Sequence, residues 1–125
     1  MKAPILKIGP YLIASLQAEL TDTDLLELQD ALVEQVGRFR SRGVILDVTT
    51  LDVMDSFATR TLRNIAQAVG LRGADAVIAG IRPEVALAMV QLGLDLRLSC
   101  VRTTLDLEEA LAILDHESKG SGRRG

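Results

Sequence analysis

The sequence is poor in residue types on which many binding and catalytic sites depend. It contains one cysteine, one histidine, one tyrosine, two phenylalanines and no tryptophan. A single cysteine, Cys100, cannot form an internal disulfide, so the sequence favours a reducing, cytoplasmic environment. Because aromatic residues make up only 2% of the chain, we expect a core of leucine, valine, isoleucine and alanine.

The distribution of charge and hydrophobicity argues against two further classes of partner. The net charge is −3, and the few aromatic side chains offer no platform for stacking bases, so we expect no nucleic-acid binding. No apolar run approaches the length of a membrane span, and no charged-then-apolar leader opens the sequence. We therefore expect a cytoplasmic protein without membrane attachment.

The chain does have enough hydrophobic material for one folded domain. Hydrophobic residues make up 48% and charged residues 25% of its 125 residues. We assign residues 1–117 to this domain. The last segment, 118–125, is polar and glycine-rich, and we expect it to be a disordered tail.

Short apolar runs alternate with segments of helical periodicity. The predicted strands are 5–8, 11–16, 44–48, 76–79 and 96–101. The predicted helices extend from caps at 21–24 to about residue 42, over 56–69, over 83–92, and from a cap at Thr104 onwards. Gly43 is expected to supply the left-handed exit of the first helix. This order predicts an α/β fold, with a mixed sheet whose centre is parallel and about four packed helices.

The segment from Val44 to Phe57 is the most informative part of the chain. An apolar strand leads into a short loop that places Asp55 and Ser56 at the start of a helix. One interpretation is that Ser56 is a helix cap and nothing more. The other is a modification site, because the start of a helix favours a phosphate; Arg60 and Arg63 would partly compensate its charge, and Asp55 would oppose it.

The sequence does not provide the further residues that a catalytic or metal site at this segment would need. A serine hydrolase would need His116 as its base, and no Gly-x-Ser-x-Gly motif surrounds Ser56. Asp47, Asp52 and Asp55 are close in sequence, but no histidine or cysteine accompanies them as a metal ligand. Neither of the common glycine-rich nucleotide motifs is present. We therefore predict no enzyme activity, catalytic residue, metal or cofactor.

The order of elements and the loop before Ser56 together resemble the STAS domain, which occurs in sulfate transporters and anti-sigma factor antagonists. The shared segments are Val53-Met-Asp55-Ser56, Gly80-Ile-Arg-Pro83 and Leu92-Gly93-Leu94, and the resemblance extends from about Pro4 to Leu114. Simple antagonists usually have Ser-Ser-Gly-Leu-Gly after the aspartate, whereas this chain has Ser56-Phe-Ala-Thr-Arg60. In this segment, and in the segments 4–8 and 104–108, the chain resembles the RsbS-type scaffold proteins of the stressosome.

The resemblance implies a non-enzymatic scaffold in a large cytoplasmic hetero-oligomer with RsbR-type STAS paralogues. Such a scaffold holds an RsbT-type serine kinase until the kinase phosphorylates the serine that matches Ser56, and an RsbX-type phosphatase resets it. The phosphoacceptor threonines of RsbR proteins are not transferred to Thr49, Thr50 or Thr59. Two alternatives stay open: a simple antagonist that binds an anti-sigma kinase, and a STAS module that senses a small ligand.

A docking surface for such a kinase is expected around the start of the second helix. Its predicted partner-binding residues are Asp55, Phe57, Thr59, Arg60 and Arg63. The sequence leaves two positions open for Phe57, which either folds back under the loop or stands exposed as a contact residue.

Overall fold

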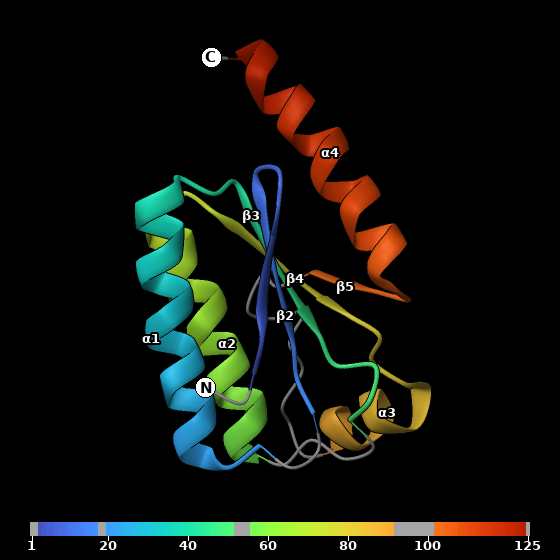
Figure 1. Cartoon of the computed structure of the whole chain (residues 1–125). Helices are drawn as coiled ribbons and strands as arrows, with labels where there is room; N and C mark the ends of the chain where they lie inside the picture. The colour runs from blue at the N-terminus through green and yellow to red at the C-terminus, as the bar shows by residue number, and fades with distance from the viewer. Residues whose placement is uncertain (1–2, 18–19, 52–55, 92–101, 125) are drawn as a thin grey trace.

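A five-stranded mixed sheet forms the centre of the protein (Figure 1). The computed structural model describes residues 3–17, 20–51, 56–91 and 102–124. The strands follow one another across the sheet in the order β1 (Ile5–Ile8), β2 (Tyr11–Ser15), β3 (Gly43–Asp47), β4 (Asp75–Ala79) and β5 (Arg102–Thr104). β1 pairs with β2 antiparallel, and the other neighbours are parallel. The prediction of a mixed sheet with a parallel centre is confirmed.

Four helices complete the α/β fold. α1 (Asp22–Phe39) and α2 (Ser56–Leu71) cover one face of the sheet, and α4 (Leu107–Arg124) contacts the other (Figure 1). α3 (Pro83–Gln91) follows β4. Proline fits the first turn of a helix because its missing N–H would have no partner there. Among the described residues, no helix combines the length and the apolar character that crossing a membrane requires.

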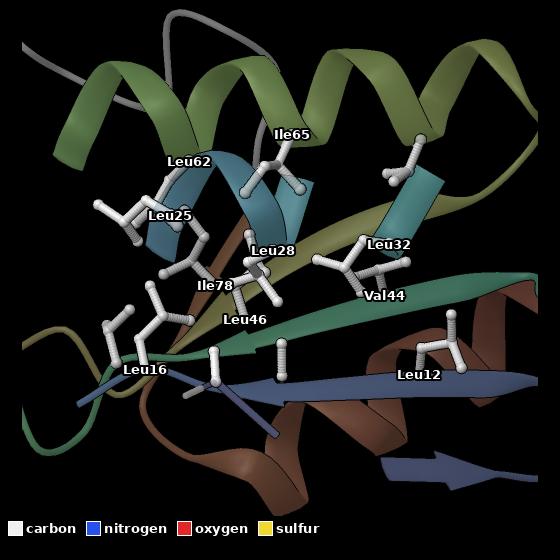
Figure 2. Packing of buried hydrophobic residues seen from close by; sticks show 14 of the residues in the cluster. Leu12, Leu16, Leu25, Leu28, Leu32, Val44, Leu46, Leu62, Ile65 and Ile78 are labelled. Atoms are coloured by element: carbon white, nitrogen blue, oxygen red, sulfur yellow. The ribbon is translucent and has the colours of Figure 1, made fainter. Parts of the chain in front are cut away.

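Two apolar clusters fill the space between the sheet and its helices. Successive side chains of a strand point to opposite faces, so Val44 and Leu46 of β3 pack toward α1 and α2, whereas Ile45 packs toward α4. Strand β3 is therefore buried on both faces, as its continuous apolar run predicts. Figure 2 shows the larger cluster, in which aliphatic side chains from the sheet, α1 and α2 meet without an aromatic ring; its labelled members include Leu12, Leu28, Leu32, Leu62, Ile65 and Ile78.

The end of α1 differs from the prediction. The helix begins as expected, because Thr21 and Asp24 form a reciprocal capping box. It ends, however, at Phe39, and the C-cap residue Arg40 takes the left-handed conformation with φ 51°. Gly43 is the first residue of β3 and is buried there. A Cβ atom on Gly43 would lie 2.8 Å from a methyl carbon of Leu114 in α4, so this glycine serves the packing of α4.

The last strand and helix also differ from their predicted bounds. The predicted strand 96–101 lies outside the described residues, and β5 is found at Arg102–Thr104. Thr104 is therefore a strand residue rather than a helix cap. Asp106 takes the capping role, since its Oδ1 accepts a 2.8 Å hydrogen bond from the backbone N–H of Glu109. The register explains the change, because Thr104 pairs with Ala79 of β4.

The segment for which a disordered tail was predicted is helical in the structure. α4 continues through residues 118–124 and ends at Arg124. No proline interrupts this stretch, and each residue added to an existing helix gains one backbone hydrogen bond. The assignment of the folded domain to residues 1–117 stays a prediction.

Candidate functional site

The loop that leaves β3 is anchored on both sides by the neighbouring strands. The backbone N–H of Leu16 donates to the carbonyl of Asp47, and that of Val48 donates to the carbonyl of Ala79, each at 2.9 Å. The Thr50 hydroxyl donates to the carbonyl of Leu16, also at 2.9 Å. The loop therefore starts at a fixed position at the carboxyl edge of the parallel strands, where open α/β sheets usually carry their sites.

Thr49 is held at the start of this loop by side-chain and backbone contacts. Its backbone N–H and its hydroxyl both donate to Oδ1 of Asp47, and an Arg82 guanidinium nitrogen lies 3.5 Å from its carbonyl oxygen. Gly80 has φ 88°, and a Cβ atom there would overlap the Thr49 hydroxyl. The glycine is thus required both by its conformation and by the close approach of Thr49.

Ser56 is the first residue of α2, as predicted. The amino end of a helix carries a partial positive charge, and the first turn of α2 contains no acidic residue. Arg60 follows one turn after Ser56 and is exposed, and Arg63 follows two turns after it and is half-buried. Asp55 lies outside the described residues. Such a helix start is suited to hold an added anion.

The predicted partner-binding residues divide between the surface and the interior. The exposed fraction of Phe57 is 37%, so of the two positions left open for it, the structure favours the exposed one. Thr59 is only 2% exposed, so it is not available on the surface of this domain for the partner contact that was predicted for it. The reason is its place on α2, three residues before the fully buried Leu62, which brings it onto the core side of the helix.

The structure does not bring together the residues that hydrolysis would need. His116 is an exposed residue of α4, and α4 packs on the face of the sheet opposite to the one that α2 covers (Figure 1). Within the described ranges, no three histidine, cysteine, aspartate or glutamate side chains are grouped as metal ligands. Asp52, Asp55 and Cys100 lie outside those ranges.

Sequence reasoning missed the part that Thr49 and Gly80 play in fixing this loop. Asp47-x-Thr49 is a pattern in which an aspartate accepts hydrogen bonds from the residue two positions on, and it was a usable signal. The contact with Gly80 had no such signal, because it joins two loops that are distant in the sequence.

Comparison with known proteins gives consistent matches over nearly the whole chain. Residues 3–110 match the STAS domain family. The RsbT co-antagonist proteins RsbRA and RsbRD of Bacillus subtilis (strain 168) are each 29% identical in sequence to this chain, over 94% and 90% of its length. The matches cover 44% and 40% of those two proteins, so the chain spans less than half the length of these relatives.

Solved structures extend the match to the fold. RsbS of Moorella thermoacetica, in a form with a serine-to-glutamate substitution, is 30% identical with a TM-score of 0.83, covering 95% of this chain and 99% of that chain. A chain from a structure of the stressosome is 32% identical with a TM-score of 0.80, covering 92% and 98%. Since the family match covers most of its length, this chain belongs to the STAS domain family.

Proposed function

We propose that this protein is a non-enzymatic, cytoplasmic scaffold of a stressosome and that its activity is controlled at Ser56. It assembles with RsbR-type STAS paralogues and holds an RsbT-type serine kinase. The kinase phosphorylates Ser56 and is released, and an RsbX-type phosphatase removes the phosphate. The observation that carries this proposal is the position of Ser56 as the first residue of α2, with Arg60 one turn further on.

The nature of the relatives supports the choice of partners. RsbRA and RsbRD are named as co-antagonists of RsbT, and the two solved structures reported above are RsbS and a stressosome chain. The anti-sigma factor antagonist SpoIIAA has a similar fold with a TM-score of 0.72 but is only 13% identical, so this likeness concerns the fold alone.

The start of α2 can accept a phosphate without a change of fold. Phosphorylation adds a charge of about −1.5 to −2, which the partial positive charge of the helix start favours. The exposed Arg60 and the half-buried Arg63 add positive charge along the same helix. Because the core residues of α2 face the sheet, the modification alters the surface and leaves the packing intact.

The same phosphate would disturb a protein bound over the start of α2. Phe57 offers an exposed aromatic ring next to Ser56, and aromatic residues often anchor interfaces. A dianion placed inside such a contact loses water without gaining a partner. A cost of about 3 kcal/mol would lower the affinity for the kinase by roughly a hundredfold.

Kinase retention tests this proposal. The chain, an RsbR-type paralogue and an RsbT-type kinase are mixed and separated by size-exclusion chromatography with and without ATP. We expect the wild type to form a large particle that releases the kinase only with ATP, Ser56→Ala to retain it in both conditions, and Ser56→Asp to retain little in either. Thr23→Asp is the matched control, because it adds a carboxylate near the start of α1 instead.

The outcomes also separate the alternatives. If the chain elutes at the size of a single domain and still binds an anti-sigma kinase, it is a simple antagonist. Kinase retention that is the same in Ser56→Asp and in the wild type would contradict the proposal.

A further inference from the structure

A groove of about 440 Å³ lies at the end of the molecule opposite to the start of α2. It is formed where the connections from α1 to β3 and from α2 to β4 meet (Figure 1). Its lining residues are Val36, Gly37, Arg40, Ser41, Arg42, Arg72 and Gly73. α2 separates it from Ser56 by about 24 Å, the length of a 16-residue helix. The volume is within the usual range for small-molecule sites.

The groove is strongly basic in a chain whose net charge is −3. Three arginines line it, and no acidic residue is among the described residues of its wall. For Arg40 and Arg72, the described part of the chain provides no hydrogen-bond or ion-pair partner for the guanidinium groups. Two guanidinium groups without a carboxylate partner are a usual arrangement for binding an oxyanion.

Backbone groups, rather than arginine side chains, cap one carbonyl at the end of each helix beside the groove. The carbonyl of Val36, in the last turn of α1, accepts from the backbone N–H groups of Arg40 and Ser41. The carbonyl of Val69, in the last turn of α2, accepts from the backbone N–H groups of Arg72 and Ala74, each at 3.0 Å. These two carbonyls therefore do not depend on an arginine side chain.

Ser41 provides an independent observation that points to a ligand. It is one of the residues that line the groove, its exposed fraction is 5%, and within the described part of the chain its buried hydroxyl oxygen has no hydrogen-bond partner. Buried hydroxyl groups are nearly always paired in folded proteins. Because this oxygen is covered in the free protein, the Ser41 side chain must turn toward the groove before an anion there can accept its hydrogen bond.

The backbone around the groove is shaped to place both arginines. Arg40 adopts the left-handed conformation, which glycine or asparagine would take more easily. Gly37 leaves room for Arg72, because a Cβ atom at Gly37 would overlap the Arg72 guanidinium. The guanidinium of Arg72 therefore lies across α1 at the edge of the groove.

We infer that this groove binds a phosphate group, either as free phosphate or as part of a small phosphate monoester, through Arg40, Arg72 and the Ser41 hydroxyl. The site does not rest on the proposed function, and its test uses the unphosphorylated chain without a kinase. A result that contradicts the phosphorylation of Ser56 would therefore not count against this phosphate site.

The test is a titration of the full chain with inorganic phosphate and with phenyl phosphate at constant ionic strength, followed by amide chemical shifts in NMR. We expect saturable shifts at residues 40–42 and 72–73. Saturation by inorganic phosphate identifies free phosphate as sufficient, and saturation by phenyl phosphate alone identifies a monoester. Shifts that sodium chloride reproduces, or that centre on Arg60 and Arg63, would overturn the inference.

Variants separate binding from folding. Arg72→Gln is expected to weaken binding by about tenfold or more, because a charge-assisted hydrogen bond is lost. Ser41→Ala and Arg40→Gly are expected to weaken binding and yet raise Tm in phosphate-free buffer, since each removes an unfavourable feature of the free protein. Arg63→Gln, in the middle of the helix α2 that ends just before Arg72, is the matched control. Unchanged affinity in Arg72→Gln and Ser41→Ala would contradict the site.

Discussion

The Tyr11 hydroxyl donates a hydrogen bond of 2.5 Å to Oδ1 of Asp115, and this bond joins strand β2 to helix α4. It lies beside the smaller apolar cluster, in which Tyr11, Ile45 and Leu114 pack together. Gly43 makes room for Leu114 in the same place. This hydrogen bond and the absence of a Cβ atom at Gly43 thus help to hold α4 against its face of the sheet.

Removing this hydrogen bond should destabilise the protein. For Tyr11→Phe we expect the free energy of unfolding to fall by about 1–2 kcal/mol, because a partly buried hydrogen bond to a carboxylate is lost. Urea denaturation measures the change. Asp115→Asn is the matched variant, which retains an acceptor oxygen and should lose less. An unchanged free energy of unfolding in Tyr11→Phe would show that the contact contributes nothing.

A pair of glycines tests the packing of the loop that precedes Ser56. Gly80 and Gly73 have similar positive φ values of 88° and 91°, but a Cβ atom would meet Thr49 at Gly80 and nothing within 4 Å at Gly73. Gly73→Ala should cost about 1 kcal/mol of stability from backbone strain alone. Gly80→Ala should cost about 1–3 kcal/mol more, because Thr49 must move. Equal losses in thermal unfolding would contradict the role given to Thr49.

The capping box of α1 predicts a difference between two threonines. Thr21→Ala removes the acceptor for the Asp24 backbone N–H and should lower the free energy of unfolding by about 1 kcal/mol. Thr23→Ala, two positions on and exposed, should change it by less than about 0.5 kcal/mol. Chemical denaturation of the two variants checks this, and a larger loss in Thr23→Ala would be inconsistent with the cap.

Phe57 is the residue most directly tied to kinase docking. If it anchors the kinase, Phe57→Ala should weaken kinase binding by about tenfold or more while leaving Tm nearly unchanged. Leu71→Ala, an exposed residue at the other end of α2, should affect neither quantity. Calorimetric titration with the kinase measures the difference. Equal affinities of Phe57→Ala and the wild type would remove Phe57 from the docking surface.

Most of the fold could be predicted because its signals are local in the sequence. The apolar run of β3, the caps at Thr21 and Asp24, and Pro83 at the start of α3 each act over a few residues. The family resemblance rested on the order of these elements and on the segment around Ser56, and the family match confirms it.

The remaining features depend on contacts between distant parts of the chain. Gly43 matches a helix exit by residue type, but Leu114 of α4 decides its role. Thr104 matches a helix cap, but pairing with β4 makes it a strand residue. Thr59 is polar and yet buried, because the sheet and α1 cover that side of α2. Only the assembled structure shows these three relationships.

The identity of the modified residue is the central claim. The chain is incubated with an RsbT-type kinase and ATP, and its intact mass and peptide map are measured beside those of Ser56→Ala. The account predicts one added phosphoryl group, carried by Ser56 and absent from Ser56→Ala. Phosphate on Thr49, Thr50 or Thr59 in place of Ser56, or an equal mass gain in Ser56→Ala, would contradict it.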